Sequence, residues 1–131
     1  MFEWSDSMHI DEMKWAEINL DHMEHNIKEI RKLVGDSVKI AAVVKANGYG
    51  HGVMNTADVL LQNGADLIAV SSINEAVEIR KKYKRAFTMV LGYTMGEKIE
   101  DAIHHGVILT IYSYEQALEC SKIAEQIGVG V

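Results

Sequence analysis

The sequence predicts an α/β fold that is built from repeated strand–helix units around a parallel sheet. Short apolar segments alternate with segments in which apolar residues recur every three or four positions. This alternation repeats about four times after the first predicted strand, at regular spacing. Consecutive βαβ units build either an open doubly wound sheet or a closed (β/α)8 barrel, and the pattern alone does not choose between them.

The first predicted unit precedes the most apolar part of the chain. Alternating apolar residues predict a strand over 15–21, followed by a helix with Asp21 as its N-cap and Gly35 at its end. The nearly continuous apolar run 38–46 then predicts a strand that is buried on both faces of a parallel sheet.

The rest of the chain continues the alternation, with Ser, Asn and Gly at the predicted helix ends. The expected elements are a helix over 53–61 closed by Asn63-Gly64, a strand over 67–70, a helix over 73–80 capped by Ser71 or Ser72, a strand over 87–91, a helix over 99–103 closed by Gly106, a strand over 107–112, and a helix capped by Ser113 that runs through Ile127.

Composition limits the classes of function. The 131 residues carry a formal net charge of −6, which argues against a nucleic-acid partner, because such a partner requires a basic face. A single cysteine, Cys120, excludes an internal disulfide and favours a reduced, cytoplasmic setting. No window approaches the ~20 apolar residues of a membrane span, so no membrane partner is expected.

The chain is expected to contain one domain. Residues 1–13 lack a regular pattern and are expected to be a leader or extension, without the basic and apolar regions of a secretory signal. Residues 14–131 form the predicted domain, because no proline and no low-complexity linker divides them.

Residues 41–52 are the most informative segment and read Ala-Ala-Val-Val-Lys-Ala-Asn-Gly-Tyr-Gly-His-Gly. The apolar strand delivers Lys45 near its end, and a glycine-rich turn follows at once. A partly desolvated amine is a nucleophile toward carbonyls, and an aldehyde cofactor that forms a Schiff base is its natural partner. The alternative is a structural lysine that extends to solvent.

The other residues of this turn have expected structural roles. Gly48, Gly50 and Gly52 are expected to permit positive φ or a close backbone approach, and their spacing differs from that of a dinucleotide-binding loop. His51 is expected to form a structural hydrogen bond, and Asn47 to bond local backbone.

The segment resembles the pyridoxal-phosphate lysine motif of bacterial alanine racemases, usually written AVVKANAYGHG, from which only Gly48 departs. The resemblance extends over about residues 15–128, nearly the whole chain. Further similar segments occur in the order of that family: 15–21 with His25-Asn26, 64–70 with Glu75-Ala76, and 90–93.

The resemblance implies a fold and an activity. The fold is the N-terminal part of a pyridoxal-phosphate-binding (β/α)8 barrel of the TIM type, here truncated, because a closed barrel needs ~200 to 250 residues. The activity is that of an isomerase that interconverts L- and D-alanine and so supplies D-alanine for peptidoglycan. The implied partners are a small amino-acid substrate and, for the full-length protein, a second copy in a homodimer.

The resemblance also implies site residues. Lys45 would bind pyridoxal 5′-phosphate covalently and serve as one of two acid–base groups, and Tyr49 would bind the cofactor phosphate. Val43 and Leu91 would line the cofactor, although plain core positions are an equal alternative. No metal site is expected.

The resemblance leaves part of the chemistry outside this chain. In the family, a tyrosine from the partner subunit acts on the opposite face of the substrate, and no residue here matches it, so the chain by itself is expected to be inactive. Two alternatives stay open: a racemase for another amino acid, such as serine or lysine, and a barrel protein that binds the cofactor without turnover. The Tyr-Gly-His-Gly sequence after Ala46-Asn47-Gly48 favours the racemase.

Overall fold

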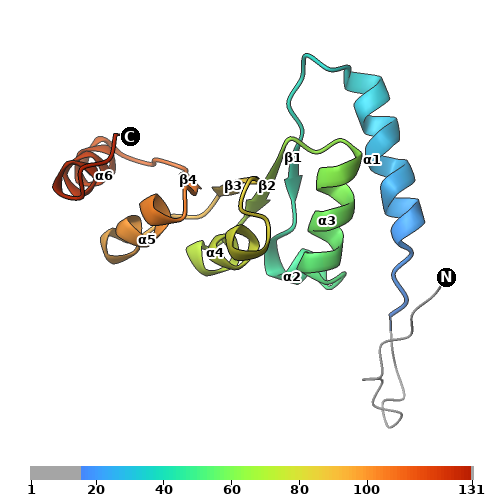
Figure 1. Cartoon of the computed structure of the whole chain (residues 1–131), viewed down its shortest axis with the longest axis horizontal. Helices are drawn as coiled ribbons and strands as arrows, with labels where there is room; N and C mark the ends of the chain where they lie inside the picture. The colour runs from blue at the N-terminus through green and yellow to red at the C-terminus, as the bar shows by residue number, and fades with distance from the viewer. Residues whose placement is uncertain (1–15, 131) are drawn as a thin grey trace, which may run out of the picture.

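The computed structural model describes residues 16–130, so the expected leader over 1–13 lies outside the described residues. Figure 1 shows α1 at one end of the molecule and α6 at the other, with the strands between them. The elements in order are α1 (Leu20–Val34), β1 (Ala41–Val43), α2 (Lys45–Tyr49), α3 (Val53–Asn63), β2 (Leu67–Val70), α4 (Ile73–Lys82), β3 (Phe87–Val90), the 3-10 helix η1 (Gly96–Lys98), α5 (Ile99–His104), β4 (Ile108–Leu109) and α6 (Tyr114–Gln126).

The four strands form one parallel sheet in the order β1-β2-β3-β4. Every strand therefore lies beside the next strand in the chain, as successive βα units do around a barrel. The predicted α/β class with a parallel sheet is confirmed. Backbone bonds continue the ladder beyond the strand ends, for example from Val44 N–H to Ala69 C=O at 2.9 Å.

Alternate strand residues face the helices and form the core. Side chains on this face are almost completely removed from water, and the helices contribute small and branched residues against them. The buried strand residues on this face are Ala42, Ile68, Val70, Thr88 and Val90, and the buried helix residues include Ile27, Ala57, Ala76 and Ile79. Ala69, on the opposite face of the central strand β2, is also buried.

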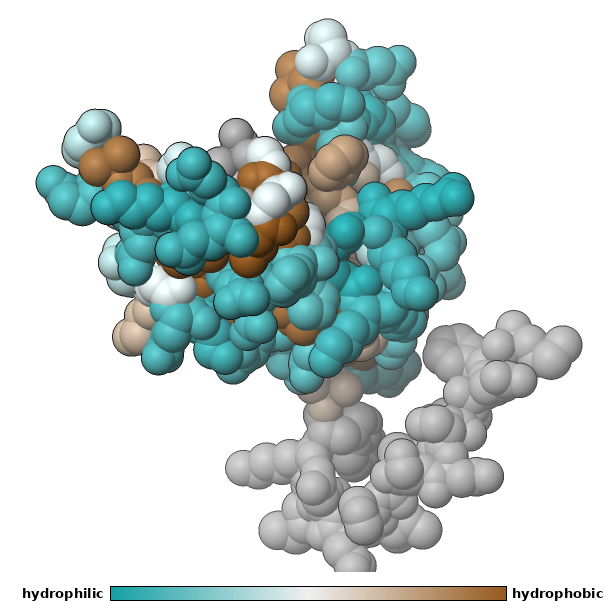
Figure 2. Space-filling view, turned by 60° about the vertical axis from the view of Figure 1, so that its left-hand side comes forward, coloured by the Kyte–Doolittle hydropathy of each residue, from teal (hydrophilic) through white to brown (hydrophobic). Residues whose placement is uncertain are grey.

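The opposite face of the sheet is open in the described part of the chain. Val43, Phe87, Leu91 and Ile108 are 41%, 66%, 37% and 38% exposed. Figure 2 shows hydrophobic surface in a hollow at the centre of the molecule, between hydrophilic surfaces. The prediction that the first apolar strand is buried on both faces is therefore wrong for this structure, because helices cover only one side.

The predicted strand over 15–21 is wrong in its described part. Residues 16–19 form no strand, because no described strand lies beside them to complete a hydrogen-bonded ladder. The N-cap of α1 is Asn19, whose side chain accepts a hydrogen bond from the His22 N–H at 3.0 Å. Asp21, the predicted cap, lies in the first turn, where its charge suits the helix dipole.

The later helix ends agree with the sequence predictions. Ser72 and Ser113 are the N-caps of α4 and α6, and each side chain accepts a backbone hydrogen bond. Gly35 and Gly64 follow the last residues of α1 and α3, as predicted. The strands β1 and β4 are shorter than predicted, because only residues with a partner on the neighbouring strand belong to the ladder.

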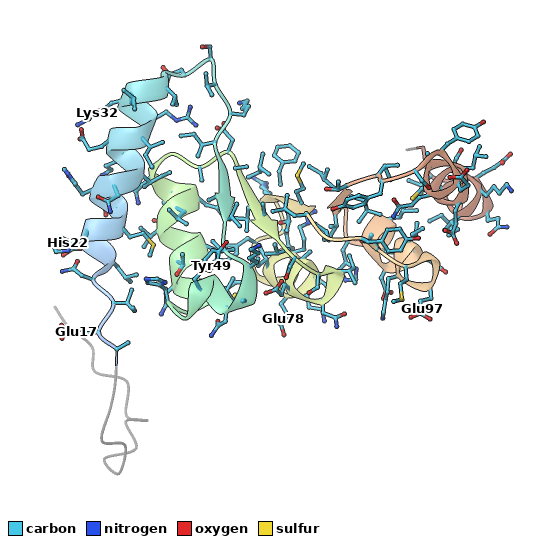
Figure 3. The ribbon with its side chains drawn as sticks, turned by 180° about the vertical axis from the view of Figure 1, so that it is seen from behind. Glu17, His22, Lys32, Tyr49, Glu78 and Glu97 are labelled. Carbon is cyan, nitrogen blue, oxygen red and sulfur yellow. The ribbon has the colours of Figure 1, made fainter. Side chains whose placement is uncertain are left out.

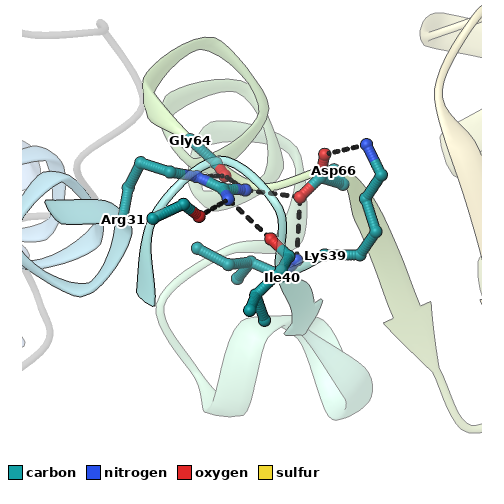
Figure 4. A network of polar contacts seen from close by, with 7 residues as sticks. Arg31, Lys39, Ile40, Gly64 and Asp66 are labelled. Atoms are coloured by element: carbon teal, nitrogen blue, oxygen red, sulfur yellow. Dashed lines mark hydrogen bonds and ion pairs between the residues drawn. The ribbon is translucent and has the colours of Figure 1, made fainter. Parts of the chain in front are cut away.

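A polar network joins α1 to the start of the sheet (Figure 4). Asp66 pairs with Arg31, accepts the Ile40 N–H at 2.8 Å, and lies 3.0 Å from the Lys39 amine. Arg31 also donates to the Gly64 carbonyl, so one guanidinium ties the end of α3 to α1. The hydrogen bond from Ile40 and the ion pairs with Lys39 and Arg31 hold the pKa of Asp66 well below its usual range.

Within residues 16–130, no helix has the length and apolar character needed to cross a membrane. The same residues contain no cluster of three or more His, Cys, Asp or Glu side chains suited to a metal ion.

The network predicts an acid-sensitive contribution to stability. The folded pKa of Asp66 is depressed, so its contribution is present above its unfolded pKa of about 4 and is lost as the pH falls toward the folded value. In the full-length protein, Asp66→Asn should lower Tm at pH 7 and should reduce the fall in Tm between about pH 5 and pH 2. Asp101→Asn removes an exposed carboxylate as the control. An unchanged pH profile in Asp66→Asn would contradict the role of the network.

Candidate functional site

The candidate site lies at the carboxyl-terminal edge of the sheet. Lys45 follows β1 after one residue, Ser71 follows β2, and Leu91 follows β3. Because the strands are parallel, their carboxyl ends meet at this edge. In barrels of consecutive βα units, this edge carries the binding and catalytic groups.

Lys45 begins a turn of unusual backbone conformation. Ala46, Asn47 and Gly48 have φ/ψ of 52/57°, 53/46° and 65/34°, and Tyr49 has a φ of 55°. These are left-handed helical dihedrals, which cost roughly 1–2 kcal/mol for each residue with a Cβ. A run of such residues persists only where the surroundings hold it in place, and such runs are concentrated at functional sites.

Side chains of the turn hold its backbone. The Asn47 Oδ1 accepts the Val53 N–H at 2.9 Å, and the His51 Nδ1 lies 2.7 Å from the Gly48 carbonyl. Both predictions for these side chains, a local backbone bond for Asn47 and a structural hydrogen bond for His51, are confirmed. A Cβ on Gly48 would lie 3.2 Å from the Thr56 Oγ1, so glycine here allows both the positive φ and the close approach of α3.

Glu75, in the first turn of α4, reaches the same turn from the neighbouring unit. Its Oε1 accepts the Ala46 N–H at 2.7 Å, and its Oε2 accepts the Ser71 N–H at 3.1 Å and the Ser71 hydroxyl at 2.8 Å. Partial burial raises the pKa of Glu75, but the hydrogen bonds from Ser71, Ala46 and Ser72 outweigh it and hold the pKa below its ordinary value.

The sequence predictions did not single out Glu75 as a site residue. Ser72 and Glu75 form a capping box, in which Glu75 accepts the Ser72 N–H and Ser72 accepts the Glu75 N–H. The S-x-x-E spacing signals this cap in the sequence. The bond to Ala46 has no such signal, because it joins residues 29 positions apart that only the sheet brings together.

Lys45 and Tyr49 are placed in one turn, as predicted. Lys45 is half-buried, and none of the ion pairs within residues 16–130 involves its amine. Tyr49 is 60% exposed, so its phenol is accessible to a ligand. Figure 3 labels Tyr49 in the green middle part of the ribbon, away from both ends of the described chain.

Val43 and Leu91 lie on the open face of the sheet, on β1 and directly after β3. The register pairs Val43 with Ala69 and Ala69 with Met89. Leu91 is two residues beyond Met89, so its side chain lies on the same face as that of Val43. The Tyr112 hydroxyl donates to the Leu91 carbonyl, and the Tyr112 ring lies 6.2 Å from that of Tyr93. Neither Val43 nor Leu91 is a buried core residue here.

These residues fit a cofactor that joins to a primary amine. Lys45 offers an amine without an ionic partner in the described chain, Tyr49 offers a phenol, and Val43 and Leu91 offer apolar surface at the same edge. The left-handed backbone of the turn sets the position of Tyr49 relative to Lys45. The arrangement is that of a βα-repeat protein with a half-buried lysine just after the carboxyl end of its first strand.

Comparison with known proteins places the chain in a family. The family model described as "Alanine racemase, N-terminal domain" matches residues 18–131. The chain belongs to this family.

Individual relatives agree with this assignment. The chain is 46% identical over 114 residues to the alanine racemase of Desulforamulus reducens, a match that covers 87% of this chain and 31% of the relative. It is 47% identical over 114 residues to that of Clostridium perfringens, covering 87% of this chain and 29% of the relative. The chain therefore spans about a third of the length of the curated relatives it matches.

Solved structures share the fold. The alanine racemase of Clostridium difficile 630 has a TM-score of 0.83 at 37% identity, over 91% of this chain and 32% of that one. The alanine racemase of Bacillus anthracis with bound L-Ala-P has a TM-score of 0.78 at 33% identity, over 86% of this chain and 29% of that one.

Proposed function

We propose that this chain supplies the lysine-bearing part of a pyridoxal-phosphate-dependent alanine racemase, in which Lys45 is the residue that binds the cofactor. The observation that carries the proposal is the position of Lys45 at the carboxyl edge of the sheet, directly before the left-handed turn. Membership of the alanine racemase N-terminal domain family supports the choice of reaction.

Each site residue has a distinct task in this proposal. The Lys45 amine would hold pyridoxal 5′-phosphate through its aldehyde group, and the same Nζ would take a proton from the substrate α-carbon or return one to it. The Tyr49 hydroxyl donates a hydrogen bond to the phosphate. Val43 and Leu91 present apolar side chains to the ring and limit the access of water.

The cofactor supplies an electron sink for the charge that develops at the α-carbon. Exchange of configuration needs a second acid–base group on the opposite face, because Lys45 acts from one side only. The whole protein is proposed to obtain that group as a homodimer, to act on alanine in the cytoplasm, and to supply D-alanine for peptidoglycan. The family assignment supports these steps.

The first prediction of the proposed function concerns the attachment point. Borohydride reduction of the full-length protein with pyridoxal phosphate should leave the label on Lys45, as located by peptide mapping. Lys45→Ala should remove the label and nearly all racemisation, whereas Lys84→Ala, at an exposed position, should change neither. A label on Lys39 or Lys98 would contradict the proposal.

The second prediction concerns Tyr49. In the full-length protein, Tyr49→Phe should weaken cofactor binding about ten- to a hundredfold, because a hydrogen bond to a charged group contributes ~1.5 to 3 kcal/mol. The measurement is a cofactor titration of the apoprotein. Tyr114→Phe, at a position 72% exposed on α6, is the matched control. Equal affinities in the two variants would assign Tyr49 to packing alone.

The third prediction concerns the 131-residue chain by itself. Without a group on the opposite face of the substrate, it should racemise alanine no faster than free pyridoxal phosphate. The open apolar face and the outer edges of the sheet should also cause self-association. A racemisation assay beside sizing chromatography tests both points. A monomer with turnover above the free cofactor would contradict the account of two-sided catalysis.

A further inference from the structure

We propose that Glu75 is a positioning residue for Lys45: its carboxylate links the backbone directly after Lys45 to the end of the neighbouring strand. The inference rests on the proposed function, because it assigns Glu75 a task in holding the cofactor-binding lysine. It adds a residue from the next βα unit to a site that otherwise consists of the 41–52 segment and Leu91.

The two oxygens of Glu75 bind two different parts of the chain. Oε1 accepts the Ala46 N–H at 2.7 Å, and Oε2 accepts the Ser71 N–H, the Ser71 hydroxyl and the Ser72 N–H at 3.1, 2.8 and 3.3 Å. One carboxylate therefore connects the ends of β1 and β2 at the carboxyl edge of the sheet. Because the carboxylate is ionised, these are charge-assisted hydrogen bonds.

The bond to Ala46 goes beyond the needs of a helix cap. A capping box requires only that Glu75 accept the N–H of its own N-cap, Ser72. Oε2 already meets this need, which leaves Oε1 for the Ala46 amide. That amide belongs to the peptide plane between Lys45 and Ala46, so the bond fixes the backbone from which the lysine side chain extends.

The position of this bond matters because Ala46 is the first left-handed residue of the turn, with a φ of 52°. A residue with a Cβ relaxes readily to negative φ unless its amide is held. Relaxation there would rotate Lys45 relative to Tyr49. Glu75 acts through the backbone and forms none of the ion pairs within residues 16–130, so it leaves the Lys45 amine available for the cofactor.

The test compares four variants of the full-length protein. Glu75→Gln cannot accept hydrogen bonds with both terminal atoms of its side chain, because the amide nitrogen that replaces one carboxylate oxygen is a donor. Glu75→Asp keeps the charge in the first turn of α4 but is one methylene shorter, so it tests the reach to Ala46 if the Gln variant does not fold. Ser72→Ala removes the helix cap and leaves the Ala46 bond intact. Glu78→Gln makes the same charge change at an exposed site on α4 (Figure 3).

Two readouts are measured beside Tm. The first is hydrogen exchange of the Ala46 amide in the apoprotein, which should become about tenfold faster or more in Glu75→Gln and Glu75→Asp. The second is the amount of cofactor needed to half-label Lys45 in borohydride trapping, which should rise by a similar factor. Ser72→Ala should lower Tm without either change, and Glu78→Gln should match the wild type.

The outcomes separate the inference from the function on which it rests. If the wild type and all the variants reach half-labelling of Lys45 at the same cofactor concentration, Glu75 does not position Lys45. The inference is then overturned while the proposed function stands. If Ser72→Ala changes both readouts as much as Glu75→Gln, the effect belongs to the helix cap, and the inference is again overturned. If Lys45 of the wild type carries no label, the proposed function fails and the role of Glu75 fails with it.

Discussion

The parallel register of β1 on β2 is the constraint on which the site depends. Ala41 lies opposite Leu67 and Val43 opposite Ala69, and the Val44 N–H continues the ladder to the Ala69 carbonyl. The two strands therefore end at the same level. As a result, the turn after β1 and the start of α4 meet at one edge, although they are far apart in the sequence. A shift of one residue would turn the buried side chains of β1 toward the open face.

The turn after Lys45 shows how local strain is held by tertiary contacts. Each left-handed residue with a Cβ is unfavourable in isolation. The turn is held from two directions, by the hydrogen bond that the Asn47 side chain accepts from Val53 at the start of α3, and by Glu75 at the start of α4. Gly48 removes the Cβ where α3 approaches most closely. The lysine is thus placed on a rigid support at the edge of the sheet, while its amine stays without an ionic partner in the described chain.

Most of the fold could be predicted from the sequence because helix ends carry local signals. The Ser caps of α4 and α6 and the glycines after α1 and α3 were recognised from residue type and spacing. Strand limits were predicted less well, since β1 and β4 extend only as far as a neighbour pairs with them. The prediction of a strand over 15–21 is wrong in its described part for the same reason. Apolar alternation indicates a strand, but a strand forms only where a neighbouring strand supplies backbone hydrogen bonds.

The sequence by itself determined the order of the βα units, the family and the segment that carries Lys45 and Tyr49, because these follow from short-range patterns and a contiguous motif. Only the tertiary structure decided which side of the sheet is covered, that residues 46–50 of the motif have positive φ, and that Glu75 binds the first of them. The physical reason is distance along the chain. A hydrogen bond between residues 29 positions apart exists only after the sheet has brought them together, and no local pattern encodes it.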